Sequence, residues 1–382
     1  MRRSMPKGFA VLLVLAAVLV PAAMAASQHR QHPSLNLALV PLPKARLGPA
    51  AAGLDLAPGS GKETDGSGRE IGYELLYGSP FLSNPGLDEV VTRVERFKTR
   101  RDANQSLALS KKQLLGELAN FTQLNLTSTT SPLSISGIGD RRWGVLATFS
   151  VANYGSLYDA FESFSDGKYV LELVVVAGSQ DLATTFVAAK AHMFDRRLDL
   201  GFDGRLHGHP VALPKFPPKL GPPASGPDPA TAVLQTSDLP GSQVDYEDYS
   251  WLSGALSAYA VNFQPAGGAY DSVNQIVSVM PTTNGAAFVD AFIGAEELAF
   301  LVAFHPGSTV ASTPVDVSAA GDEAQAAIAS VTGPSLTANV AVVTLHSGPL
   351  ADIVLAESKT TIDPATVQTL AQSAATRLDA AH

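Results

Sequence analysis

A proline-rich segment divides this 382-residue chain into two parts that repeat one pattern of strands and helices. Residues 210–229 contain eight prolines among twenty positions. That density excludes a helix or a central strand, because proline has no backbone N–H to donate and its ring clashes with a preceding helical turn. We therefore predict a linker over residues 206–230, between one folded unit at 71–205 and a second at 231–382.

Short patterns recur on the two sides of this linker, in the same order and at an offset of about 180 to 186 positions. Any one match is expected by chance, but the shared order and the near-constant offset indicate an internal duplication. The matching pairs are Tyr73 and Tyr259, Glu117-Leu118-Ala119 and Glu297-Leu298-Ala299, Gly139-Asp140 and Gly321-Asp322, Asp181 and Asp363, and Arg197-Leu198-Asp199 and Arg377-Leu378-Asp379.

Each copy carries the same succession of hydrophobic patterns, which predicts elements in the order β-α-β-β-β-α. Leu107, Leu114 and Leu118 fall on one face of a helix. Asp166-Gly167 is typical of a tight turn between antiparallel strands. We predict an α+β fold of two tandem related units, each a mainly antiparallel sheet with its helices on one face. The predicted strands are 91–97, 143–150, 160–164 and 169–176, then 273–279, 325–331, 339–345 and 351–356, and the last helix of each unit begins at Asp181 or Asp363.

The N-terminal residues 1–25 have the pattern of a bacterial export signal. Arg2, Arg3 and Lys7 precede an apolar run over 9–20, and Ala23-Met24-Ala25 has the small residues of a cleavage site. We expect a cleaved signal peptide, followed by a flexible N-terminal segment over 26–70 that is rich in small and polar residues. The alternative is an uncleaved signal anchor. Both interpretations place the chain outside the cytoplasm, secreted or in the cell envelope.

Composition excludes several kinds of chemistry. The chain contains no cysteine, which excludes disulfides, thiolate metal sites and a cysteine nucleophile. The formal net charge is −9, and residues 231–382 hold two basic side chains against fifteen acidic ones. An acidic second half repels phosphate backbones, so we expect no nucleic-acid partner. No further apolar run is long enough to span a membrane once the signal is removed.

The strongest candidate for ligand binding is an aromatic and acidic stretch that opens the second unit. Carboxylates bind Ca²⁺ and aromatic rings stack on sugars, although the spacing here is not that of an EF-hand. A weaker candidate is His207-Gly208-His209, which offers two imidazoles for a metal ion. The candidate ligand-binding residues are Asp245, Tyr246, Glu247, Asp248, Tyr249 and Trp251.

The segment just before this stretch, Asp238-Leu239-Pro240-Gly241, resembles the "DLPG" opening of exported α+β proteins of high-GC actinobacteria. More loosely, it resembles the extracellular sensor domains of mycobacterial receptor Ser/Thr kinases. The likeness covers about ten residues of the second copy, and the first copy offers only Leu42-Pro43. This chain lacks the cysteines that those sensor domains use for disulfides. The resemblance implies a sensor-like role in the cell envelope.

These observations favour an exported, non-catalytic protein that binds a small ligand or an envelope protein, without a cofactor. No local motif pairs His192, His305 or His346 with a nucleophile, and we expect no catalytic residue. Two alternatives stay open at this point. One is an extracellular hydrolase whose active residues come from separate segments, and the other is a structural interaction protein of the envelope. Sequence patterns leave the oligomeric state undetermined.

Overall fold

The computed structural model describes most of the chain from residue 35 onward. The predicted signal peptide over 1–25, Trp251 and His305 lie outside the described residues. The described ranges are 35–57, 60–63, 69–78, 86–120, 126–151, 155–213, 221–250, 252, 254–266, 268–291, 309–321, 323–332 and 337–381.

The first unit is an antiparallel sheet with a helix on each face. Its strands lie in the order β1-β3-β4-β8-β7-β6-β5, and β2 pairs with β3. The elements are β1 (Asp55–Leu56), β2 (Gly61–Glu63), β3 (Arg69–Gly78), β4 (Leu87–Phe97), α2 (Arg100–Asn120), β5 (Leu126–Leu133), β6 (Arg141–Val151), β7 (Gly155–Asp166), β8 (Tyr169–Ala177) and α3 (Gln180–Phe202).

The second unit repeats this plan, with its strands in the order β12-β13-β14-β15-β11-β10-β9. A helix that is described over residues 283–291 follows β11, as α2 follows β4. The other elements are η3 (Pro229–Thr231), β9 (Val244–Ser250), β10 (Ser257–Phe263), β11 (Ser272–Val279), β12 (Thr309–Val315), η4 (Ser318–Ala320), β13 (Gln325–Thr332), β14 (Thr337–Ser347), β15 (Leu350–Ser358) and α5 (Pro364–Ala380).

Strand order and register support the internal duplication. β3-β4-β8-β7-β6-β5 in the first sheet corresponds to β10-β11-β15-β14-β13-β12 in the second. Pro132 lies opposite Val145, and Pro314 lies opposite Ala327, so both partners are displaced by the same 182 positions (132 to 314 and 145 to 327). The two sheets therefore share one topology and, at this edge, one pairing register.

The α+β class and the tandem units are confirmed, but the six strands that the two units have in common are two more than the sequence predicted for each. The shared order is β-β-α-β-β-β-β-α, because β3 and β10 precede the first predicted strand and β5 and β12 follow the first helix. β1 and β2 in the first unit and β9 in the second lie outside this shared set. β5 has the sequence LTSTTSPL, whose small polar residues show no apolar alternation. Its pairing with β6 supplies the strand geometry that its own composition does not indicate.

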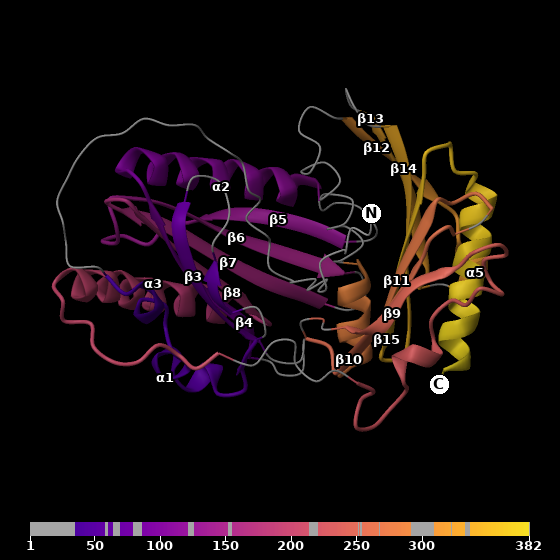
Figure 1. Cartoon of the computed structure of the whole chain (residues 1–382). Helices are drawn as coiled ribbons and strands as arrows, with labels where there is room; N and C mark the ends of the chain where they lie inside the picture. The colour runs from indigo at the N-terminus through magenta and orange to yellow at the C-terminus, as the bar shows by residue number, and fades with distance from the viewer. Residues whose placement is uncertain are drawn as a thin grey trace.

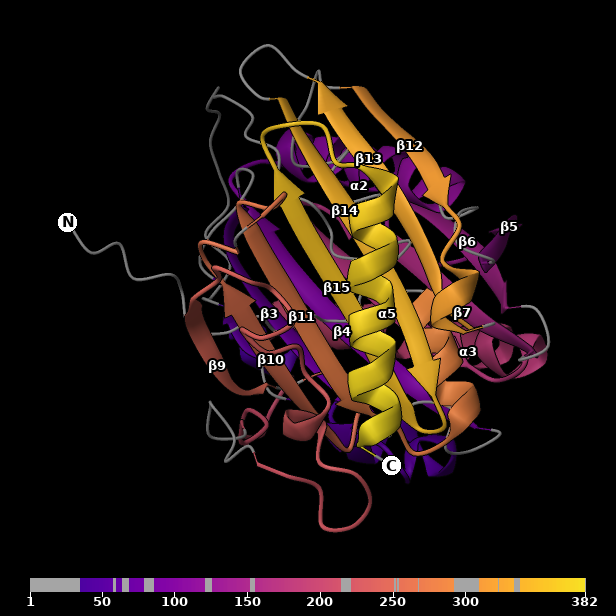
Figure 2. The ribbon, with the colours of Figure 1, turned by 90° about the vertical axis from the view of Figure 1, so that its right-hand side faces the viewer.

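The two helices of a unit lie on opposite faces of its sheet, which corrects the expectation of helices on one face (Figure 1). Ala103, Leu107 and Leu114 of α2 pack in one apolar cluster, whereas Phe186 and Phe194 of α3 pack in another. β8 explains the difference, because all nine of its residues are buried and both of its faces need covering. In the second unit α5 covers the outer face of the sheet (Figure 2).

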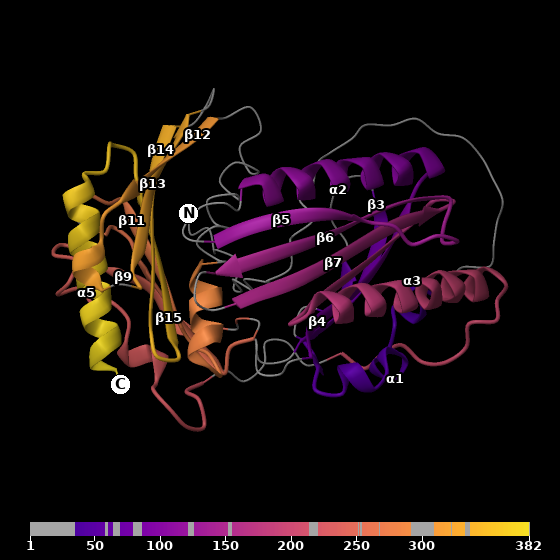
Figure 3. The same ribbon diagram turned by 180° about the vertical axis from the view of Figure 1, so that it is seen from behind.

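The inner faces of the two sheets share one apolar cluster, which joins the units. It contains Trp143 and Phe161 of the first unit, which stack at a centroid distance of 4.7 Å. It also contains Leu252, Met280 and Phe288 of the second unit. The helix of residues 283–291 contributes Phe288 and lies between the second sheet and the first unit (Figure 3). The units are thus packed together rather than separated along a spacer.

Residues 35–57 are packed on the first unit, which corrects the prediction of a flexible segment over 26–70. Leu42 and Leu47 are buried in the cluster beneath α3. The Arg197 guanidinium of α3 donates to the carbonyl oxygen of Val40 at 2.9 Å and to that of Leu39. Their irregular spacing hides these leucines from a periodicity search, because they pack from short turns rather than from one long element. Among the described helices, none is long and apolar enough to cross a membrane.

Because the two units share this cluster, we expect a substitution that destabilises one unit to destabilise the other as well. Replacing Phe288 with alanine should cost about 3 kcal/mol or more of unfolding free energy, because it leaves a cavity in this core. We expect Trp143 in the first unit to report the loss. The measurement is urea unfolding followed by Trp143 fluorescence in a Trp251→Phe background. A Trp143 transition at the wild-type urea concentration would show that the units unfold independently.

Candidate functional site

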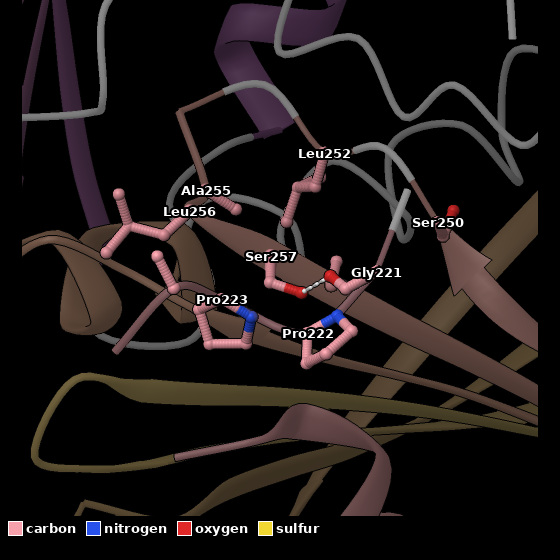
Figure 4. A pocket seen from close by; sticks show the side chains of 10 residues that line it. Gly221, Pro222, Pro223, Ser250, Leu252, Ala255, Leu256 and Ser257 are labelled. Atoms are coloured by element: carbon pink, nitrogen blue, oxygen red, sulfur yellow. Dashed lines mark hydrogen bonds between the residues drawn. The ribbon is translucent and has the colours of Figure 1, made fainter. Parts of the chain in front are cut away.

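A pocket of about 450 Å³ lies where the proline-rich linker crosses the second sheet (Figure 4). One wall is a strap of linker residues, and the other is the end of β9 with the start of β10. The lining consists of apolar side chains and two serine hydroxyls. The lining residues are Gly221, Pro222, Pro223 and Ala224 of the strap, and Ser250, Leu252, Ala255, Leu256, Ser257 and Ala258 of the second unit.

Hydrogen bonds hold the strap on both sides of the pocket. At one end the Ser257 hydroxyl donates to the carbonyl oxygen of Gly221 at 2.8 Å. At the other end the Tyr249 hydroxyl donates to the Asp228 carboxylate, with oxygen distances of 2.8 and 3.0 Å. The Asp228 carboxylate also accepts the Ala230 N–H at 3.0 Å. Prolines restrict the backbone between these points, so this wall of the pocket is held before any ligand arrives.

The structure places five of the six predicted ligand-binding residues, Asp245 to Tyr249, on β9 at the edge of the second sheet. Asp245, Tyr246, Glu247 and Asp248 are exposed. The Tyr249 ring packs edge-on against that of Tyr259 of β10, with the ring centroids 5.1 Å apart. Desolvation and the Asp228 carboxylate raise the pKa of the Tyr249 hydroxyl to about 12. Residue 250, the next along the strand, lines the pocket. The predicted stretch is thus adjacent to the pocket rather than its lining.

The predicted metal pair His207 and His209 lies in an exposed segment between α3 and the strap. Within the described part of the chain, no three His, Asp or Glu side chains are grouped so that they could hold a metal ion. The same holds for the carboxylates of β9, which the sequence offered for Ca²⁺. A metal role for His207 and His209 therefore stays a sequence-based hypothesis.

The motif Asp238–Gly241 anchors the fold. The Asp238 carboxylate accepts from the Arg377 guanidinium of α5 at 2.8 and 3.1 Å and from the Gln235 N–H at 2.8 Å. Leu239 is buried beneath α5. Arg377 corresponds to Arg197 of the first unit, which holds residues 39–40 against α3 through their backbone carbonyl oxygens. The repeated arginine therefore binds the segment that leads into each sheet, and the motif does not line the pocket.

Polar groups are buried in both units, away from the pocket. In the first, Arg93 of β4 lies between Glu74 of β3 and Glu172 of β8, at 2.7 and 3.1 Å. In the second, His346 Nδ1 lies 3.5 Å from the Asp290 carboxylate, and its Nε2 lies 3.7 Å from Glu323. Burial raises the pKa of Asp290 to about 7, and His346 opposes the shift. Because both ring nitrogens of His346 face carboxylates, neither is placed to activate a nucleophile.

The sequence does not show the strap as part of a site. Residues 206–230 are predicted only as a Pro-rich linker, because prolines and glycines carry no chemistry of their own. The available signal was Leu252 to Leu256, an apolar stretch directly after the aromatic and acidic residues. Its meaning depends on the strap folding back over it, which no local pattern shows.

Glu162 of β7 predicts how stability depends on pH. The side chain is fully buried over Gly144, and neither carboxylate oxygen has a hydrogen-bond partner. Burial raises the pKa of Glu162 from 4.5 to about 8, against the pull of Arg142. The folded chain therefore keeps a proton that the unfolded chain loses, and stability falls as pH rises from about 4.5 to 8. Asp159 and Asp290, whose pKa values burial raises to about 7, act in the same direction.

Wild-type unfolding free energy should decrease between pH 5 and pH 8. We expect Glu162→Gln to make this decrease smaller by about 1 to 2 kcal/mol, because the amide stays neutral at every pH. The measurement is the free energy of urea unfolding at pH 5 and pH 8. The exposed Glu357→Gln is the matched control and should keep the wild-type difference. An unchanged difference in Glu162→Gln would contradict the prediction.

No protein-family model and no curated protein matches the sequence. Among solved structures, the chain is similar to the extracellular domain of PknH from Mycobacterium tuberculosis, at 11% identity and a TM-score of 0.32, over 44% of this chain and 100% of that one. It also matches the di-domain ARO/CYC BexL from the BE-7585A biosynthetic pathway, at 12% identity and a TM-score of 0.15, over 81% and 94%. The resemblance to a mycobacterial kinase extracellular domain, expected from Asp238–Gly241, is confirmed as a structural match of low TM-score, which assigns no function to this chain.

Proposed function

We propose that this chain is an extracytoplasmic, non-catalytic binding protein, and that the strap pocket holds an apolar part of its ligand. The observation that carries the proposal is the composition of the pocket. Its ten lining residues are glycine, proline, alanine, leucine and serine. Such side chains hold a ligand by shape and apolar contact. General acid or base catalysis would require titratable groups at the same place.

Two further features support binding. Leu256 is 52% exposed on the pocket rim, although leucine is usually buried. A bound apolar group would cover it, and the pocket volume of about 450 Å³ suits a small ligand. The strap needs little ordering on binding, because Ser257 and Tyr249 already hold it. The extracytoplasmic location rests on the N-terminal export pattern.

The test uses N-phenyl-1-naphthylamine, a neutral fluorescent probe that the acidic second unit does not repel. We expect saturable binding that Leu256→Ser weakens by about threefold to tenfold, because the substitution removes an apolar wall. Leu213→Ser is the matched control, since Leu213 is 41% exposed and does not line the pocket. It should bind the probe as the wild type does.

If Leu256→Ser and Leu213→Ser changed the affinity for the probe equally, the strap pocket would not be the binding site. Both leucines are exposed, so neither variant should lose its fold, and circular dichroism checks this. A probe signal that grows only in partly unfolded protein would reflect exposed core rather than a site, and would also overturn the proposal.

A further inference from the structure

The open edge of the second sheet differs from the other sheet edges that the structure describes. β5 and β12, the corresponding edges of the two sheets, each contain a proline, at Pro132 and Pro314. The opposite edge of the first sheet is covered by the short strands β1 and β2. β9 is a seven-residue strand without proline. Proline and short strands are common devices against unwanted strand pairing, and β9 uses neither.

The side chains of β9 leave this edge open to a partner. Five consecutive residues from Val244 to Asp248 are exposed, and the apolar Val244 and Tyr246 are 42% and 49% exposed. β9 pairs on one side with β10, and in the described part of the chain no strand pairs with its other side. An edge strand presents unpaired backbone N–H and C=O groups in the direction of its free side. A further strand would extend the sheet there.

The charge of β9 decides which strand would fit. Asp245, Glu247 and Asp248 place three carboxylates within four residues. A second copy of this chain would set carboxylates against carboxylates, which disfavours pairing. A basic strand would instead form charge-complementary pairs. The carboxylates thus disfavour self-association and favour a basic partner. Specific interfaces commonly combine such attraction to one partner with repulsion of others.

One hydrogen bond within β9 could be replaced when a basic strand binds. The Tyr249 backbone N–H donates to the Asp248 carboxylate at 2.8 Å. A lysine or arginine of an incoming strand would pair with Asp248 and draw it away, and a carbonyl oxygen of that strand would then accept the Tyr249 N–H. Basic side chains and an extended backbone would therefore bind together.

We propose that β9 is a docking edge for an extended, basic segment of a partner protein, which adds to the second sheet as an eighth strand next to its seven. This inference goes beyond the pocket ligand and does not depend on it. The partner is defined by its chemistry, namely lysine or arginine side chains on a backbone that is free to form strand hydrogen bonds.

The experiment uses the purified chain and a blocked peptide, Lys-Val-Lys-Lys-Val-Lys, at low ionic strength. Affinity is measured by calorimetry, and hydrogen exchange locates the site. We expect the peptide to protect the amides of residues 244–250, and we expect Glu-Val-Glu-Glu-Val-Glu not to bind. Lys-Pro-Lys-Lys-Pro-Lys has the same charge but lacks two amide hydrogens, and it should bind about tenfold more weakly.

The matched pair of variants separates local from global charge. Glu247→Lys/Asp248→Lys should weaken the lysine–valine peptide about tenfold or more, because it reverses the sign of the edge. Glu357→Lys/Asp379→Lys makes the same change in net charge at two exposed residues outside β9, and it should have a much smaller effect. Both pairs lie on the surface, and circular dichroism checks that each variant is folded.

Three results would overturn the proposal. Equal binding of the proline peptide would mean charge attraction without strand addition. Equal effects of the two double variants would mean that β9 is not the site. A dimer of the wild-type chain that Glu247→Lys/Asp248→Lys disrupts would assign the edge to a second copy instead. None of these results bears on the strap pocket, whose test uses a neutral probe and Leu256.

Discussion

The apolar cluster that the two units share is the constraint on which the rest of the structure depends. The chain has no cysteine, so its folded parts are held without disulfides. Each sheet carries a long helix on its outer face, α3 or α5. Its inner face packs with α2 or with the helix of residues 283–291 in the cluster that the two units share. Phe161 of the first unit and Phe288 of the second both belong to that shared core. The duplication thus does more than repeat a unit, because each copy supplies what the other needs for burial.

This packing also explains where the binding features lie. The linker returns across the second sheet and forms one wall of a pocket at the start of β10. Tyr249 belongs to both features, since its hydroxyl holds Asp228 of the strap and its backbone belongs to the edge strand β9. A ligand in the pocket and a partner on the edge would therefore act on neighbouring parts of one strand.

Elements with strong local signals could be predicted. The β7–β8 hairpin turns at Asp166-Gly167, and α5 begins after the Asp363 cap with Pro364 in its first turn, as expected. Elements without such signals could not. β5 has small polar residues and Pro132, and it is a strand because it pairs with β6. Residues 35–57 show no hydrophobic period, and Arg197 of α3 helps to hold them on the first unit. The candidate residues of β9 were found from composition, whereas the strap pocket was not, since prolines and alanines show no chemistry until they face each other.

The sequence by itself determined the two related units, the linker between them, the α+β class and the charge of each half, because these follow from local patterns and counts. Tertiary structure alone decided that the two units share one apolar core, that the helices of a unit lie on opposite sides of its sheet, and that the linker forms one wall of a pocket. These outcomes depend on contacts between residues far apart in the chain. Periodicity shows which face of an element is apolar, but not which other face will cover it.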